Sequence, residues 1–377
     1  MRKRGLWLLL VPQLLFAGEA ARLLDTQPKA IEAYARAQEL ILEKGLPRRS
    51  PGELTEAAIQ GMIASLDPYG ELMTKAEVLE LEQASMGRYV GVGILVSHQE
   101  KQFLVSRVYP QSPAAQAGLV RGMEILSING SKLEAAPDPE ALFRQMGGKV
   151  GQGVLLQCRL QGKEQAFKLK VAEIQYPSTR FERLPGGVLV IELSDFLKDS
   201  AKEIKTEFTK ERPNAVVLDL RGNPGGLLYS AVEVADLFLP QGEIVRLQGN
   251  QGEALETYQA HGLGYLGDFP LALLIDHQSA SSAEILAGAL LDHKRARLFG
   301  ERSYGKGSIQ SLFEITDDLV VKLTIARYLT PSGRSIHEKG IDPHQVVRED
   351  LKAELHSPAD PPFQAALTWL ARQKITP

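Results

Sequence analysis

The chain has little of the chemistry that sulfur and aromatic rings supply. Among 377 residues there is one cysteine, Cys158, and aromatic residues make up 6%. A single cysteine excludes an internal disulfide and a cysteine-rich metal site, and no cysteine stands near the N-terminus to carry a lipid. The folded chain must therefore be stabilised by its apolar core, which a chain of this length is able to build.

An excess of charge of either sign is also missing. The formal net charge is -3, from 43 Lys and Arg against 46 Asp and Glu. This balance gives no electrostatic reason to expect a nucleic-acid partner. The glycine-rich stretch "GNPGG" lacks the spacing of both nucleotide-binding glycine motifs, so a nucleotide cofactor is not expected either.

Long apolar runs are rare, and the N-terminus holds a notable one. Three basic residues, Arg2 to Arg4, precede an uncharged, mostly apolar run over residues 5–18, and small residues follow it. This order is typical of a secretory signal, and the run is short for a membrane span, which needs about 20 apolar residues. We expect residues 1–20 to be a signal peptide or an N-terminal anchor. The protein would then be exported to the periplasm or cell envelope, and membrane-associated if the segment is retained.

The remaining sequence changes character along its length. Charged helical periodicity comes first, then short β-rich runs with helices at 112–119 and 138–148, then an alternation of apolar strands with helices. We expect an α/β multidomain protein. Its predicted parts are a helical N-terminal region (22–86), a small β-rich domain (87–172), a layered α/β core (173–347) and a C-terminal helical tail (348–377).

Three serines stand where an apolar strand-like run gives way to a helix-like one, in "LIDHQSASSAEILAGAL". Ser281 and Glu284 form the Ser-x-x-Glu pattern of a capping box, which favours a structural role. Capping and catalysis are compatible, because the N–H groups and the dipole at a helix N-terminus would stabilise a developing oxyanion. The pattern alone leaves both roles open.

A nucleophilic serine requires a neighbouring base. His277 lies only four residues before Ser281, and no aspartate is placed recognisably to orient it. Lys306, in "YGKGS", has glycines on both sides and lies between apolar strands. Desolvation there would lower the lysine pKa and leave a neutral amine able to take a proton, although a lone lysine is more often a solvated turn residue.

Several motifs together resemble one known family. The sequence resembles the carboxyl-terminal processing proteases, also called tail-specific proteases. The resemblance is carried by the β-rich domain and by "LDLRGNPGGLL", "SASSAEILAGAL" and "YGKGSIQ", with several motifs in the family's order. The resemblance runs from about Leu66 to Val347. It implies an exported serine endopeptidase with a serine–lysine pair and an inserted PDZ domain, acting without a metal or organic cofactor.

The resemblance also assigns roles to particular residues. Ser281 would be the nucleophile, Lys306 the base and Gln310 a residue that assists the lysine. The backbone of Ser282 and of Gly225 or Gly226 would form the oxyanion hole, and Ser279 would be structural. Ser282 remains the rival nucleophile, since only the register separates it from Ser281.

The β-rich domain carries a further expectation. "YVGVGI" resembles the loop and strand by which PDZ domains hold a terminal carboxylate on backbone N–H groups, which implies protein or peptide substrates with free C-termini. The residues concerned are Tyr89, Val90, Gly91, Val92, Gly93 and Ile94. Three positions depart from the family pattern: Arg121-Gly122-Met123 replaces Pro-Gly-Asp, Asp276 replaces Asn and Arg302 replaces Pro.

Two other functions and one partner stay open. A non-catalytic PDZ scaffold or chaperone would need no reactive serine, and a serine–lysine amidase acting on small molecules or cell-wall peptides would need no PDZ groove. The terminal helices have apolar faces that fit either a homodimer or packing within the chain.

Overall fold

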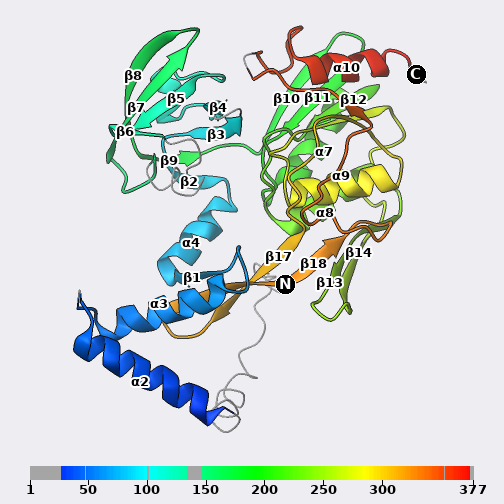
Figure 1. Cartoon of the computed structure of the whole chain (residues 1–377). Helices are drawn as coiled ribbons and strands as arrows, with labels where there is room; N and C mark the ends of the chain where they lie inside the picture. The colour runs from blue at the N-terminus through cyan, green and yellow to red at the C-terminus, as the bar shows by residue number, and fades with distance from the viewer. Residues whose placement is uncertain (1–26, 47, 100–101, 134–145, 352, 374–377) are drawn as a thin grey trace, which may run out of the picture. The chain divides into compact units, whose positions relative to one another are not determined.

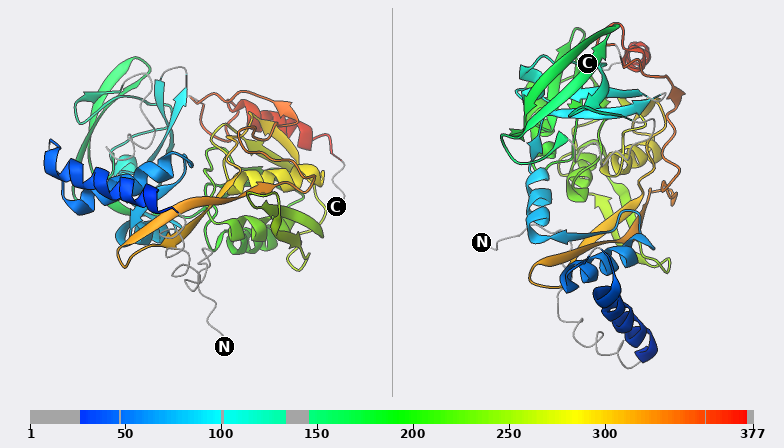
Figure 2. Two further views of the ribbon diagram at one scale, coloured as in Figure 1. Left: turned by 60° about the horizontal axis from the view of Figure 1, so that its bottom comes forward. Right: turned by 60° about the vertical axis from the view of Figure 1, so that its left-hand side comes forward.

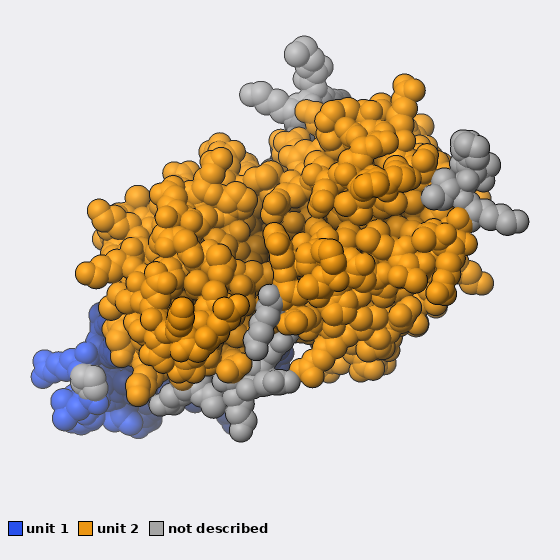
Figure 3. All heavy atoms as spheres, turned by 90° about the horizontal axis from the view of Figure 1, so that it is seen from above, with its two compact units in different colours: residues 1–79, 308–326 blue, residues 80–307, 327–377 orange. Residues whose placement is uncertain are grey.

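The structure is a computed structural model that describes residues 27–46, 48–99, 102–133, 146–351 and 353–373 (Figure 1). The chain divides into two compact units, residues 1–79 with 308–326 and residues 80–307 with 327–377 (Figure 3). The expected signal segment and most of the helix expected at 138–148 lie outside the described residues. In the described part, no helix combines the length and the apolar character that a membrane span requires.

The first unit joins N-terminal helices to strands from late in the chain. Its elements are α2 (Pro28–Lys44), α3 (Pro51–Ala64), β1 (Glu71–Thr74), β17 (Ser308–Glu314) and most of β18 (Leu319–Leu329). Helix α3 begins with a capping box, in which Glu53 N–H donates to Ser50 Oγ (3.2 Å) and Ser50 N–H donates to the Glu53 carboxylate (2.7 Å). Strand β1 pairs antiparallel with β18, and a small core forms around Met73, Leu312 and Val320.

The second unit begins at Glu80, within α4 (Lys75–Ala84). Its first part is a β-rich region. Its strands are β2 (Arg88–Gly91), β3 (Ile94–Gln99), β4 (Gln102–Val108), β5 (Glu124–Ile128), β6 (Ser131–Lys132), β7 (Gly153–Leu160), β8 (Lys163–Lys170) and β9 (Ala172–Gln175), with the short helix α5 (Pro113–Gln116). Alternate residues of β7 face the core, among them Cys158, whose thiol pKa burial raises to about 11. The single cysteine is therefore a core residue with an unreactive thiol.

A six-stranded sheet forms the rest of the second unit, in the order β10-β11-β12-β15-β16-β19. Its strands are β10 (Thr179–Leu184), β11 (Val188–Leu193), β12 (Ala215–Asp219), β15 (Leu271–Ile275), β16 (Arg297–Gly300) and β19 (Gln345–Val346), parallel from β11 onward. Helices α7 (Ser200–Glu211), α8 (Leu228–Phe238) and α9 (Ser282–Asp292) lie on one face and α10 (Pro361–Leu370) on the other (Figures 1 and 2). The alternation of strands and helices expected between residues 188 and 294 is confirmed.

The hairpin β13 (Gly242–Gln248) and β14 (Ala254–Ala260) separates α8 from β15, and the end of β18 pairs with β13. Strands β12 and β15 are buried along their whole length because helices cover both sheet faces. They are also adjacent and parallel, so the loops that follow them leave the same edge of the sheet. Ala280 N–H donates to Asn223 O (2.9 Å), which joins the two loops directly.

A buried ionic cluster connects the end of β12 to the C-terminal segment. Arg221, 4% exposed, bonds Asp219 (2.7 Å), Asp360 (2.8 Å) and Glu349 (3.3 Å). Asp219 Oδ2 also lies 2.9 Å from His356 Nε2, within hydrogen-bonding distance. Removing one partner of such a buried network leaves an uncompensated charge, so its members depend on one another.

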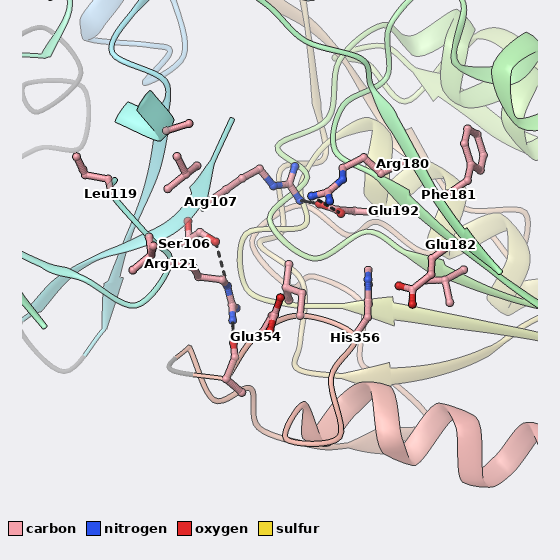
Figure 4. A pocket seen from close by; sticks show the side chains of 16 residues that line it. Ser106, Arg107, Leu119, Arg121, Arg180, Phe181, Glu182, Glu192, Glu354 and His356 are labelled. Carbon is pink, nitrogen blue, oxygen red and sulfur yellow. Dashed lines mark hydrogen bonds and ion pairs between the residues drawn. The ribbon is translucent and has the colours of Figure 1, made fainter. Parts of the chain in front are cut away.

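Arg121 ties the β-rich region into the same cluster. Its guanidinium donates to Glu349 Oε1 (2.5 Å), to Ala353 O (2.7 Å) and to Ser106 O (3.1 Å). A cavity of about 640 Å³ lies alongside, lined by Ser106, Arg107 and Arg121 from the β-rich region and by strand and C-terminal residues that include His356 (Figure 4). Arg121, which stands where the family pattern has Pro, thus connects the β-rich region to the C-terminal segment through hydrogen bonds.

The cluster predicts a pH-dependent stability. Burial raises the pKa of Glu349 from 4.5 to about 7, against the opposing effect of Arg121 and Arg221 and with a further upward contribution from Asp276 and Asp219. Between these values the folded chain binds more protons than the unfolded chain, so this group's contribution to stability falls as the pH rises.

Glu349→Gln removes that titration. We therefore expect the free energy of unfolding of the wild type, relative to Glu349→Gln, to decline from about pH 5 to about pH 8 in urea denaturation. Glu354→Gln, an exposed carboxylate of the same segment, is the matched control. Parallel pH curves for the wild type and Glu349→Gln would contradict the prediction.

Candidate active site

The three serines of the sequence motif lie in different environments. Ser279, 1% exposed, donates from Oγ to Leu220 O (2.8 Å) and accepts from Asp276 N–H (3.0 Å). Ser282, 2% exposed, donates from Oγ to Gly226 O (2.9 Å). Ser281 is the half-exposed member of the three. The hydroxyls of Ser279 and Ser282 are thus committed to holding loops, which favours Ser281 for chemistry.

The backbone of Ser281 is strained. It is the N-cap of α9 with φ 54° and ψ −116°, a conformation that a non-glycine residue rarely adopts. Such strain persists only where surrounding bonds hold it, and it is concentrated at functional sites. A sharp turn between a strand and a helix also presents the side chain at the sheet edge, as a nucleophile requires.

The Glu284 carboxylate supplies part of that restraint. It is fully buried and accepts from Ser281 N–H (3.0 Å), Ser303 Oγ (2.5 Å), Gly305 N–H (2.7 Å) and Lys306 N–H (2.8 Å). Burial raises its pKa, while the four hydrogen bonds oppose that shift. Because Ser281 and Lys306 both donate to Oε2, one carboxylate oxygen brings the backbones of the two residues together.

The Lys306 loop depends on its glycines. A side chain at Gly305 would meet the backbone of Gly340 at 3.0 Å, and one at Gly307 would meet the backbone of His337 at 2.7 Å. Gly305 also has φ 92°, which favours glycine. Lys306 itself is half-buried. The glycines on both sides of Lys306 thus allow other backbone segments to approach its loop closely.

The glycines of "NPGG" lie against the serine loop. A Cβ on Gly225 would be 2.8 Å from Ser281 Cβ and 3.1 Å from Ser282 N, and its φ is 113°. Gly225 N–H donates to Asn223 Oδ1 (2.8 Å). Of the two candidate amides, this favours Gly226 as the oxyanion donor beside Ser282.

Gln310 belongs to the first unit, whereas Lys306 belongs to the second. The side-chain amide of Gln310 donates to Ser308 Oγ (3.0 Å) and Thr324 Oγ1 (3.1 Å). Asp67 accepts from Thr324 N–H (2.6 Å) and Oγ1 (3.0 Å), and these bonds lower its pKa against the effect of burial. Asp67 lies in "SLDPYGEL", the segment that links α3 to β1. No sequence pattern would have paired it with Thr324.

Two histidines lie beside these loops. His277 Nε2 is 3.0 Å from Ser97 Oγ of strand β3, so its ring is engaged with the β-rich region. His337 lies against Gly307, and its Nδ1 is buried without a hydrogen-bond partner among the described residues. Sequence reasoning missed His337, and any test of the base must include it.

The loop expected to hold a carboxylate runs from β2 into β3. Val92 O accepts from Ala114 N–H (2.9 Å) and Gly93 O accepts from Tyr109 N–H (3.0 Å). A Cβ on Gly93 would be 2.1 Å from Ser112 Cβ. Because C=O and N–H of one peptide group point in opposite directions, the amides of Gly93 and Ile94 face away from these partners.

The described residues contain no group of three or more His, Cys, Asp or Glu side chains that could hold a metal ion. The site's geometry offers a hydroxyl on a strained turn, an amine on a neighbouring loop and backbone amides beside both. That set of groups suits acyl transfer to serine.

Glu284→Gln should destabilise this site. The amide keeps one acceptor oxygen for four donors and turns its NH₂ toward buried N–H groups. Each unsatisfied buried donor costs about 1–3 kcal/mol, so we expect a loss of roughly 2–4 kcal/mol in the free energy of unfolding, measured by urea denaturation. Glu182→Gln, an exposed glutamate of β10, should change it by less than about 0.5 kcal/mol. A Glu284→Gln variant as stable as that control would refute the bridging role.

Comparisons with known proteins agree with this chemistry. The profile of peptidase family S41 matches residues 187–347. A carboxyl-terminal-processing protease of Synechocystis sp. is 37% identical over 336 residues, covering 84% of this chain and 77% of its own. A CtpA-like serine protease of Staphylococcus haemolyticus is 32% identical over 306 residues, covering 80% of this chain and 61% of its own. The chain thus spans about three fifths of the staphylococcal relative's length.

A solved structure extends the likeness to the fold. The photosystem II D1 C-terminal processing protease superposes with a TM-score of 0.62 at 27% identity, over 84% of this chain and 86% of that chain. The mixed α/β architecture is therefore that of a known peptidase fold. The chain belongs to the carboxyl-terminal processing proteases, serine-type endopeptidases of peptidase family S41.

Proposed function

We propose that this protein is an exported serine endopeptidase that cleaves peptide bonds through an acyl-enzyme on Ser281, with Lys306 as the base. The observation that carries the proposal is the shared Glu284 oxygen, which accepts from the N–H groups of both residues at 3.0 and 2.8 Å. Its consequence is a strained, half-exposed serine held beside a half-buried lysine.

The reaction begins when Ser281 Oγ attacks the scissile carbonyl carbon and the neutral Lys306 amine takes the hydroxyl proton. The negative oxygen that forms is bound by the N–H groups of Ser282 and Gly226. The C–N bond then breaks, and the Lys306 ammonium gives its proton to the leaving amine. A water molecule then attacks the ester carbon while Lys306 takes its proton. The bond between that carbon and Ser281 Oγ breaks, Lys306 returns the proton to Ser281 Oγ, and the new carboxyl terminus is released. Gln310 would assist the lysine.

Substitutions of the three serines and of Lys306 should reduce turnover to different extents. Ser281→Ala should abolish peptide hydrolysis, Ser282→Ala should retain an intermediate level and Ser279→Ala a substantial one. Lys306→Arg should be inactive despite its charge, because a guanidinium does not release its proton. The measurement is kcat/KM on an unstructured polypeptide, with circular dichroism to verify folding. Near-normal turnover by Ser281→Ala or Lys306→Arg would overturn the assignment.

Histidine variants are the matched controls. His277→Ala and His337→Ala should both retain turnover, since the base is a lysine. An inactive but folded His337→Ala, beside an active Lys306→Arg, would assign the base to the histidine against Gly307 instead.

Labelling by an active-site serine reagent separates the enzyme from a non-catalytic scaffold, which would not react at Ser281. Turnover of small amides but not of polypeptides would indicate an amidase.

We also propose that the β-rich region, 87–172, is a PDZ domain that selects substrates by their C-terminal tail. The amides of Gly93 and Ile94 turn away from the region's own bonds, as a carboxylate-binding loop needs, and β3 offers an edge for an added strand. Signal-directed export to the periplasm or cell envelope, retention at the membrane and a homodimer belong to the same proposal. Helix α2 supports the dimer with exposed Tyr34, Leu40 and Ile41.

Tail selection predicts that a free carboxylate accelerates cleavage. Peptides that end in apolar residues should be cut several-fold faster than the same peptides with an amidated terminus or a charged last residue, because the amide lacks the negative charge that the backbone N–H groups bind. Mass spectrometry of cleavage products from such matched pairs gives the rates. Equal rates for free and amidated peptides would remove the β-rich region from substrate selection.

A further inference from the structure

Tyr328 is a buried tyrosine that the mechanism above does not use. It lies near the end of β18 and is 1% exposed, among the largest fully buried side chains described. Its backbone N–H donates to Gly307 O (3.1 Å), and it pairs with Leu247 of β13. The backbone of Tyr328 is therefore fixed directly against the loop of Lys306.

The hydroxyl of Tyr328 reaches both members of the proposed catalytic pair. It is 3.0 Å from Ser281 O and also hydrogen-bonds to Lys306 O. A phenol has one proton to donate, so the two carbonyls share it in a three-centre bond. One buried hydroxyl thus joins the carbonyl sides of two residues whose N–H sides are already joined by Glu284.

The contact matters because the Ser281 backbone is strained. At φ 54° and ψ −116° its conformation must be held by its neighbours. Its N–H is bound to Glu284, and its carbonyl accepts from Glu284 N–H (2.8 Å), from Ile285 N–H (3.0 Å) and from the Tyr328 hydroxyl. The two amide donors come from the same helix, α9. Tyr328 is the donor that comes from another part of the chain.

The path of the chain also indicates why the contacts of Tyr328 with the Lys306 loop matter. The polypeptide passes from one compact unit to the other between residues 307 and 308 and returns between residues 326 and 327. Lys306 is the second residue before the first passage, and Tyr328 is the second residue after the return. The bonds of Tyr328 to Gly307 and Lys306 therefore join the two ends of this segment within the second unit.

We infer that Tyr328 is a positioning residue for the peptidase reaction, and this inference rests on the function proposed above. Its hydroxyl holds the carbonyls of Ser281 and Lys306 in one arrangement and takes no part in bond breaking. Without it, substrate still binds, but the hydroxyl of Ser281 and the amine of Lys306 meet less often in the reactive geometry.

The test is Tyr328→Phe, which removes one oxygen atom and keeps the ring. We expect kcat to fall on the order of tenfold, with KM within about twofold of the wild type, since an interaction that aligns the reacting groups is lost while binding is not. Both enzymes are assayed well below their melting temperatures, on the same free-tailed peptide. Tyr265→Phe, which removes a hydroxyl bonded to Asp268 in its own loop, should leave both constants unchanged.

The possible results distinguish a failure of the positioning role of Tyr328 from a failure of the proposed function. A wild type that cleaves peptides, with Tyr328→Phe unchanged in kcat or altered only in KM, overturns the positioning role and leaves the proposed function standing. A wild type that neither cleaves peptides nor reacts at Ser281 with a serine reagent overturns the proposed function, and the role of Tyr328 with it. A lower kcat in both tyrosine variants would assign the loss to general destabilisation and overturn the inference.

Discussion

The geometry of the site depends on one carboxylate, that of Glu284. Its two oxygens accept four hydrogen bonds, one from the turn that carries Ser281 and three from the segment that carries Lys306. These bonds favour the ionised form and oppose the burial that raises its pKa. The same glutamate caps α9 and holds the loop of Lys306, so helix initiation and the position of that loop beside Ser281 rest on one interaction.

Close backbone approach is the other constraint, and glycine permits it. At Gly225 an added side chain would collide with Ser281 and Ser282, and at Gly307 with His337. The loops after β12 and β15 and the loop before β17 can therefore come together without side chains between them. Ser281 is the exception, a residue with a side chain in a conformation that favours glycine. The bonds from Glu284, Ile285 and Tyr328 hold it there.

Much of this arrangement could be predicted from the sequence because it is local. The apolar strands, the helices between them and the Ser-x-x-Glu pattern are short-range signals, and β11, β12 and β15 lie in apolar runs of the sequence, whereas the hairpin β13–β14 has no such run along β14. The contacts of Glu284 with Gly305 and Lys306, and of Tyr328 with Ser281, join residues more than 20 or 40 positions apart. No periodicity carries such pairings. The same limit hid the bonds between Asp67 and Thr324, and it hid His337 beside the Lys306 loop.

The departures from the family pattern show where this chain can vary. Asp276 accepts from Gly222, Gln278 and Ser279 through Oδ1 alone, an oxygen that Asn also has, so the loop tolerates either residue. Arg302 forms an exposed ion pair with Asp342 (2.6 Å), and such pairs contribute little.

Arg121 differs from these two, because it joins Glu349 and, through it, the cluster of Arg221. Arg221 stands in the motif "LDLRGNPGG", four residues before Gly225, and its own carbonyl accepts from Arg107 of strand β4 (3.1 Å). The β-rich region therefore connects to the segment that leads into Gly225 and Gly226 through two arginines. Arg107 bonds the backbone of Arg221, and Arg121 bonds Glu349, a partner of the Arg221 side chain.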